Sequence, residues 1–202
     1  MIKFKVKQIL HEKNLDDYIV EFNDEIVVKA RLESARAVKN RYGTNPTLLR
    51  LNYYQNEEVK YQFNGALLDD FLIRDKLNNL VGTILSFNPS VFALFQHFSY
   101  RINFNSHDYF VEEQINLNEG LRIKIFNEDD EVVAIVNKSK ITVNYLDNYS
   151  VEICDNKYFD LAALFTLFLD INRFNNFDDL IEGELNPDQS LNKELLNHNL
   201  HS

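Results

Sequence analysis

The chain has 202 residues, of which 45% are hydrophobic and 13% aromatic, and its formal net charge at pH 7 is −10. A chain of this size and composition can bury a sizeable core in one or two domains, which excludes disorder over most of its length. The negative net charge argues against general nucleic-acid or anionic-membrane binding, because both depend on neutralising phosphates with Lys and Arg. The single cysteine, Cys154, excludes an internal disulfide.

The N-terminal residues 1–7 alternate lysine with apolar side chains and lack the continuous apolar core of a signal peptide. With no leader and no paired cysteines, a cytoplasmic location is expected, with peripheral attachment to a membrane as a further option. Five glycines and three prolines are few for a protein with many turns. The turns are therefore expected to use Asn and Asp, which tolerate left-handed backbone conformations.

Short apolar or alternating runs, separated by acidic or amide-rich turns, recur along the chain and predict a series of β-hairpins. The five predicted hairpins pair 18–22 with 26–30, 48–54 with 59–63, 71–73 with 80–85, 121–126 with 132–136, and 141–145 with 149–153. Such a meander must curl, pair with a second sheet or close, since long open edges invite aggregation.

Two stretches interrupt the hairpin rhythm. Residues 34–46 are polar and basic, and they predict a long loop or a short helix. Residues 88–90 read Asn-Pro-Ser before the apolar run 91–98, which is compatible with a capped short helix or with a further strand.

The apolar run 161–169 predicts a helix that is buried on every side. Asn156 is the expected cap, and Asp160 lies in the first turn, where a carboxylate suits the positive helix end. The run has no polar stripe, only Thr166, whose hydroxyl can bond back to its own backbone. It is also much shorter than the roughly 20 apolar residues of a membrane span. A surrounding closed barrel would supply the apolar contacts instead.

The sequence FNEDDEVVAI at 126–135, the runs 141–145 and 149–153, and the apolar helix ending in Asp170 together resemble the C-terminal half of LURP-one-related and tubby C-terminal-like proteins, relatives of the phospholipid scramblases. The resemblance covers about residues 121–172. It implies a mainly β fold, a closed antiparallel barrel of about twelve strands around the C-terminal hydrophobic helix.

Within that implied fold, the barrel domain would span residues 1–174, with its central helix at 158–172. A polar tail would follow at 175–202, where Leu191, Leu195, Leu196 and Leu200 could form one face of a short helix. Such a helix could dock on the barrel or on a partner, and as a terminal segment it could equally stay free.

One basic cluster could recognise a phosphate or an anionic lipid headgroup, with a solvated loop as the alternative. Its members are Arg31, Arg36, Lys39 and Arg41. Tubby proteins bind phosphoinositides through basic residues, although no individual match to these four can be made.

Enzymatic chemistry finds little support. The chain has no glycine-rich phosphate loop, nucleophile elbow or paired-cysteine motif, and its five histidines are scattered. Cys154 is expected to be a packed thiol and not a nucleophile. The acidic run 128–131 is read as a solvated turn and not as a calcium loop, because it lacks the alternating spacing and glycine of such loops. Scramblases are thought to bind calcium just before their final helix, where Asp155, Asn156 and Asp160 match poorly. No metal or cofactor is predicted.

The sequence therefore predicts a non-enzymatic binding or scaffold protein that recognises an anionic phospholipid or a protein partner at a membrane surface. Two alternatives remain open. An enzyme with an unrecognised site at the barrel mouth should show a concave pocket with converging polar groups of perturbed pKa. A homo-oligomeric structural protein should expose a large apolar patch.

Overall fold

A computed structural model describes residues 1–12, 15–36, 47–66, 71–86, 98–116, 120–138 and 146–174 of the chain. The first six strands are β1 (Ile2–Glu12), β2 (Leu15–Phe22), β3 (Glu25–Arg36), β4 (Thr47–Gln55), β5 (Glu58–Ala66) and β6 (Phe71–Asp75). The next six are β7 (Leu80–Ser86), β8 (Phe98–Phe104), β9 (His107–Asn116), β10 (Gly120–Phe126), β11 (Val132–Lys138) and β12 (Asn148–Ile153). A 3-10 turn η1 (Asn156–Tyr158), the helix α1 (Phe159–Leu169) and a π turn η2 (Asp170–Phe174) follow.

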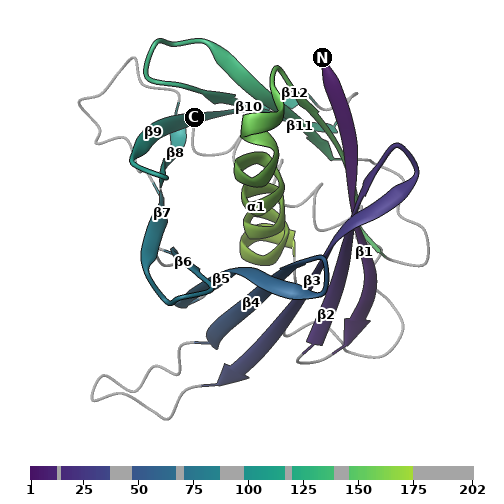
Figure 1. The fold of residues 1–202 in the computed structure, drawn as a ribbon. Helices are drawn as coiled ribbons and strands as arrows, with labels where there is room; N and C mark the ends of the chain where they lie inside the picture. Colours follow the sequence, from purple (N-terminus) through teal and green to yellow (C-terminus); the bar gives the residue numbers. More distant parts are fainter. Residues whose placement is uncertain are drawn as a thin grey trace, which may run out of the picture.

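The twelve strands form one closed antiparallel barrel around α1 (Figure 1). Each strand pairs with its neighbours in sequence, and β1 closes the ring by pairing with β12, from Ile2 opposite Ile153 to Lys7 opposite Asn148. Closure gives each of these described strands a partner on both sides, which removes the open edges of a flat sheet. The predicted mainly β barrel around a C-terminal helix is confirmed.

Alternation along the strands sends apolar side chains inward. In β6, Phe71 and Ile73 are each 1% exposed, while Leu72 between them points outward. The hairpin turns use the residue types expected for a chain with few glycines. Both central residues have positive φ in the turns at Asn23–Asp24, Asn56–Glu57 and Asn105–Ser106. Turns of this kind match the right-handed twist of the flanking strands.

The central helix is the middle of the hydrophobic core. Every residue from Leu161 to Leu169 is buried, and the Thr166 hydroxyl donates to the Ala162 carbonyl oxygen at 2.7 Å, as expected. Phe168 packs edge-on against Phe71 and Tyr100, with ring centroids 5.0 and 5.4 Å apart. The barrel wall therefore supplies the apolar surroundings that the helix requires.

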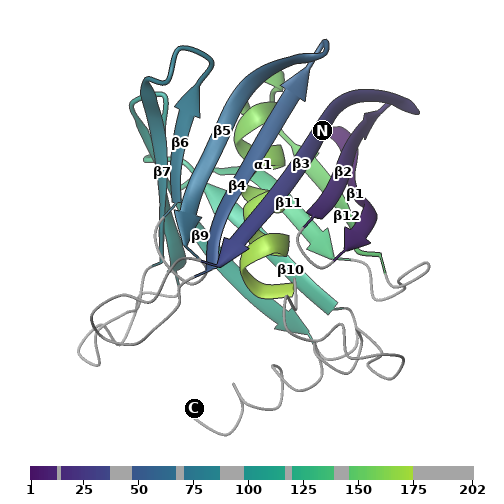
Figure 2. The same ribbon diagram turned by 90° about the horizontal axis from the view of Figure 1, so that it is seen from below.

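The two ends of the barrel differ. The tight-turn end carries the turns after β2, β4, β6, β8 and β10 together with the start of α1. The far end holds the end of α1, the end of β1 and the starts of β2 and β12, and Figure 2 shows these two ends at the top and bottom of the view. Among the described residues, no helix combines the length and apolar character needed to cross a lipid bilayer.

Three local predictions need correction. The helical segment is capped by Asp155, whose carboxylate accepts from the Lys157 amide at 2.9 Å, and not by Asn156. Cys154 is exposed and not packed, because it follows the inward-facing Ile153 at the turn into η1. The predicted pairing of 149–153 with 141–145 is wrong, because β11 and β1 occupy both edges of β12.

Several other predictions fall on residues outside the described ranges. These are the helix-or-strand alternative over most of 91–98, the strand 141–145 itself, most of the connection 34–46, and the tail 175–202. Residue 98 is the first of strand β8.

Candidate functional site

The predicted basic cluster is only partly within the described residues. Arg31 lies on the outer face of β3, and its guanidinium donates to both carboxylate oxygens of Asp17, at 2.7 and 2.8 Å. This pairing raises the pKa of Arg31. Arg36 is the last residue of β3, while Lys39 and Arg41 lie outside the described ranges. Arg31 is therefore already neutralised by a neighbouring strand.

The acidic run 128–131 is an internally bonded hairpin turn. The Asn127 side-chain oxygen accepts from the amides of Asp129 and Glu131, at 3.0 and 2.8 Å. The Glu128 carboxylate accepts from the Asp108 amide at 2.8 Å. Within the described part of the chain, no group of three or more His, Cys, Asp or Glu is placed to hold a metal ion.

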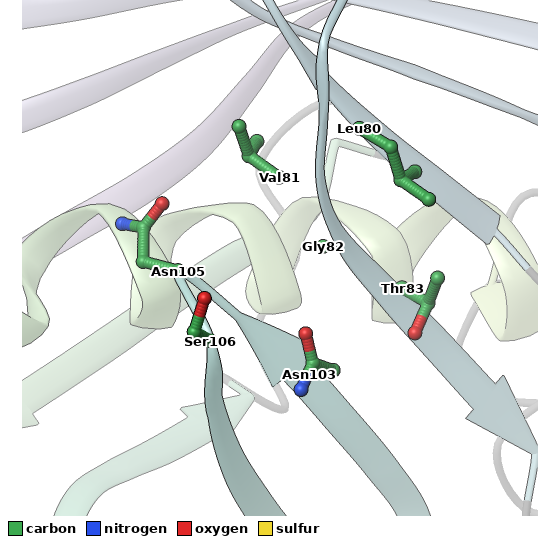
Figure 3. Close-up of a pocket in the computed structure, with 7 residues that line it drawn as sticks. All are labelled: Leu80, Val81, Gly82, Thr83, Asn103, Asn105 and Ser106. Carbon is green, nitrogen blue, oxygen red and sulfur yellow. The ribbon is translucent and has the colours of Figure 1, made fainter.

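A surface groove of about 430 Å³ lies where β7 meets the β8–β9 hairpin (Figure 3). Its lining is Leu80, Val81, Gly82, Thr83, Asn103, Asn105 and Ser106, and this lining contains no ionisable side chain. A Cβ on Gly82 would come within 2.5 Å of the Asn103 carbonyl oxygen, so only glycine allows β7 and β8 to approach this closely. Leu80 and the neighbouring Leu77 are 55% and 75% exposed.

The strongest concentration of polar chemistry is buried at the far end of the barrel. We name it the far-end cluster, and its members are Gln8, His11, Asp16, Tyr18, Lys138, Asp147, Tyr149 and Asp170. At its centre is Asp170, the first residue of η2, which is 1% exposed. Its two carboxyl oxygens accept from the hydroxyls of Tyr18 and Tyr149, at 2.7 and 2.6 Å. Both tyrosines are also buried.

The remaining members form a second layer around this centre. Lys138 makes an ion pair with Asp147, and both side chains are less than 10% exposed. Gln8 links Asp16 to Asp147. Its side-chain amide donates to the Asp16 carboxylate at 3.3 Å and accepts from the Asp147 backbone amide at 3.3 Å. A further contact joins His11 Nδ1 and the Asp16 carboxylate, at 2.5 Å.

Burial sets the protonation of the far-end cluster. Desolvation, reinforced by the charge of Asp147, raises the pKa of Asp170 to about 8, although its two tyrosine partners and Lys138 act in the opposite direction. Burial also raises the pKa of Tyr18 and of Tyr149 well above the usual value, so both stay neutral donors. The hydrogen bond that protonated His11 donates to the Asp16 carboxylate raises the pKa of His11, against the opposing effect of burial.

At the tight-turn end, a second aspartate contacts the barrel wall. Asp160, in the first turn of α1, accepts from Lys60 Nζ at 2.6 Å and from the Tyr53 hydroxyl at 2.9 Å. Tyr61 is a third neighbour, and burial raises its pKa to about 12. Asp160 therefore joins the positive end of the helix dipole to β4 and β5, through a hydroxyl and a cation.

Sequence reasoning missed the far-end cluster. Its members come from β1, β2, β11, β12 and η2, so no local motif joins them. The available signal was the alternation of inward-facing and outward-facing residues along the strands. Gln8 continues the inward-facing series Phe4 and Val6, and Asp16 begins the inward-facing series Tyr18 and Val20. Polar residues at such positions are buried and must find partners.

The far-end cluster can take up or release a proton, because Asp170 is a buried carboxyl group whose pKa is raised. The side chains satisfy one another, and His11 is the most exposed member, with 24% of its side chain exposed.

Comparison of the chain with models of protein families, with curated proteins and with solved structures finds no match. The twelve-stranded barrel around a helix is compatible with the resemblance to tubby C-terminal-like proteins, which no family match supports.

Proposed function

We propose that this protein is a non-enzymatic binding module of the tubby C-terminal-like type, acting at the cytoplasmic surface of a membrane. One observation carries the proposal: the interior of the barrel is filled by the protein's own helix, since Leu161 to Leu169 are all buried there. Small-molecule sites are usually concave and largely preformed, so a filled barrel leaves recognition to the outer surface and the loops.

The ligand we propose is the anionic headgroup of a membrane phospholipid. Residues 34–46 contain Arg36, Lys39 and Arg41 and no acid, although the whole chain has a net charge of −10. Some of the basic side chains elsewhere on the outer face stand in ion pairs, as for Lys3 with Glu152 and Arg101 with Asp108. Arg31 is one of these paired residues, so the proposal rests on the other three.

Vesicle binding tests this proposal. Phosphatidylcholine vesicles with and without a phosphoinositide are sedimented with the full chain at low salt and at about 0.15 M salt. Each Lys or Arg near an anionic surface contributes roughly 1 kcal/mol, so replacing Arg36, Lys39 and Arg41 together by Ala should weaken binding by about 100-fold. Binding should require the anionic lipid and should weaken as salt is added.

A matched control removes the same charge elsewhere. Lys3, Lys76 and Arg101 lie in exposed ion pairs with acids, so their joint replacement by Ala changes the net charge equally. This variant should keep at least the wild-type affinity. Equal losses in both triple variants, or no binding by the wild type, would contradict a headgroup site at 34–46.

A protein partner is the second candidate ligand, because the groove beside β7 is uncharged and includes the exposed Leu80, with the exposed Leu77 three residues earlier in the chain. A partner at this surface would be lost when both leucines are replaced by Ser and kept when Arg36, Lys39 and Arg41 are replaced by Ala. The opposite result with the same two variants would favour the headgroup proposal.

A further inference from the structure

We propose that Asp170 and the two tyrosines that hold it form a pH-sensitive latch at the C-terminal end of the central helix, closed while the carboxyl group is protonated and loosened when it ionises. This role is separate from the proposed headgroup binding. The geometry is a clamp: Tyr18 on β2 and Tyr149 on β12 reach the two oxygens of one carboxyl group on η2. The clamp therefore joins two wall strands to the end of the helix.

The site opposes a negative charge at Asp170 in three ways. The residue is 1% exposed, and transfer of an ionised carboxylate from water to such a place is costly. It follows the last residue of α1, where the helix dipole presents its negative end. The nearby charge of Asp147 is the third factor, because it opposes ionisation of Asp170, whereas the phenol hydroxyls and Lys138 favour it.

Charged and titratable groups act on Asp170, or on its neighbour His11, from four strands of the described residues. His11 comes from β1, Asp16 and Tyr18 from β2, Lys138 from β11, and Asp147 and Tyr149 from β12 and the residue before it. Asp147 raises the pKa of Asp170, whereas Lys138 and the two tyrosines lower it. Since the Asp16 and Asp147 carboxylates have their own partners in His11 and Lys138, Asp170 is the acid of the cluster that is left to neutral donors.

The direction of the switch follows from the two states of the latch. In the closed state the pKa of Asp170 is about 8, and in an opened, hydrated state it returns toward the ordinary value of 3.8. Between these values the open form binds fewer protons, so rising pH favours opening. His11 acts in the same direction, because its contact with Asp16 is fully stabilising below the ordinary histidine pKa and is lost as pH rises through the raised one.

Hydrogen exchange of the full chain measures this opening. After correction for the intrinsic exchange rate, the opening constant of the amides from Leu167 to Asn172 should rise roughly tenfold per pH unit from about pH 5 and should level off above about pH 8. In Asp170→Asn, which keeps a neutral group of similar shape, this rise should disappear. Any remaining change above about pH 6.5 belongs to His11.

Asp160→Asn is the matched control, because it makes the same change at the other end of the helix and should keep the wild-type pH dependence. If Asp170→Asn does not fold, Tyr149→Phe provides the second test. Loss of one donor to the carboxylate should move the pH at which the opening constant levels off to a higher value. In the wild type, carbon-detected NMR should place the Asp170 titration near 8. A titration near the ordinary value of 3.8, or an unchanged pH dependence in Asp170→Asn, would overturn the latch.

Discussion

The two ends of the central helix hold aspartates in opposite situations. Asp160 is at the positive end of the helix dipole, its side chain is 19% exposed, and it contacts a lysine. Asp170 is at the negative end, is fully enclosed, and contacts two tyrosines. The same side chain is therefore a conventional anchor at one end and a proton-binding group at the other. Position relative to water and to the helix dipole makes the difference.

The largest effect is expected between these ends, in the middle of the helix. Leu164 is 1% exposed among apolar side chains, so Leu164→Asp introduces a buried charge without a partner. We expect a loss above about 5 kcal/mol, which abolishes folding. Circular dichroism and urea unfolding measure this, with Leu164→Met, expected to cost less than about 1.5 kcal/mol, as the control. Cooperative folding of the Leu164→Asp variant would mean that the helix is not the core.

Neutralising Asp170 should have the next largest effect, and it should depend on pH. The wild type loses stability as pH rises from about 4 to about 8, because the unfolded chain ionises first. Asp170→Asn should be within about 1 kcal/mol of the wild type near pH 5 and more stable by roughly 2–4 kcal/mol near pH 8. Urea unfolding at both pH values decides this. Equal destabilisation at the two pH values would indicate that Asp170 acts only through its hydrogen bonds.

Removing a tyrosine hydroxyl separates the contribution of the hydrogen bonds to Asp170 from that of its charge. Tyr149→Phe leaves one Asp170 oxygen without its phenol partner, at an expected cost of about 1–3 kcal/mol. The cost should grow with pH, because the lost bond favours the ionised carboxylate. Urea unfolding across the same pH range measures it, and Tyr109→Phe, at a tyrosine outside the cluster, is the comparison. A cost that does not change with pH would mean that the Tyr149 hydroxyl has no effect on the ionisation of Asp170.

The smallest effect is expected at the tight-turn end. Asp160→Asn removes an ion pair with Lys60, whose side chain is 35% exposed, and a favourable helix-dipole interaction. Because solvent screens such a pair, we expect a loss of at most about 1 kcal/mol that shrinks in high salt. Thermal unfolding at low and high salt measures this. A loss as large as that of Tyr149→Phe would show that the two ends of the helix contribute equally to stability.

Most of the barrel could be predicted from local patterns, and the missing pieces have identifiable causes. The strands of four predicted hairpins follow inward–outward alternation and Asn or Asp turns, which are local properties. Strand β1 is not among the predicted hairpins, although its lysines alternate with apolar residues, because one of its two partner strands is β12, far away in the sequence. The turn at Asn105–Ser106 was missed as well, since its neighbouring strands carry many polar residues.

The candidate sites were less predictable than the fold. Arg31 is one of a basic series in the sequence, and only the register of β2 against β3 places Asp17 opposite it. The far-end cluster brings together Tyr18 and Asp170, which are 152 residues apart in the chain. Spacing within a segment carries no information about such contacts.

By itself the sequence determined the strand-rich architecture and the enclosed helix, because alternation, turn chemistry and an apolar run without a polar stripe are properties of consecutive residues. Only the tertiary structure decided how the ring closes, with β1 against β12, and which polar side chains are trapped at the end of the helix. The reason is physical: the pKa of Asp170 depends on the desolvation and the charges that strands distant in sequence impose on it, and these exist only once the barrel has closed.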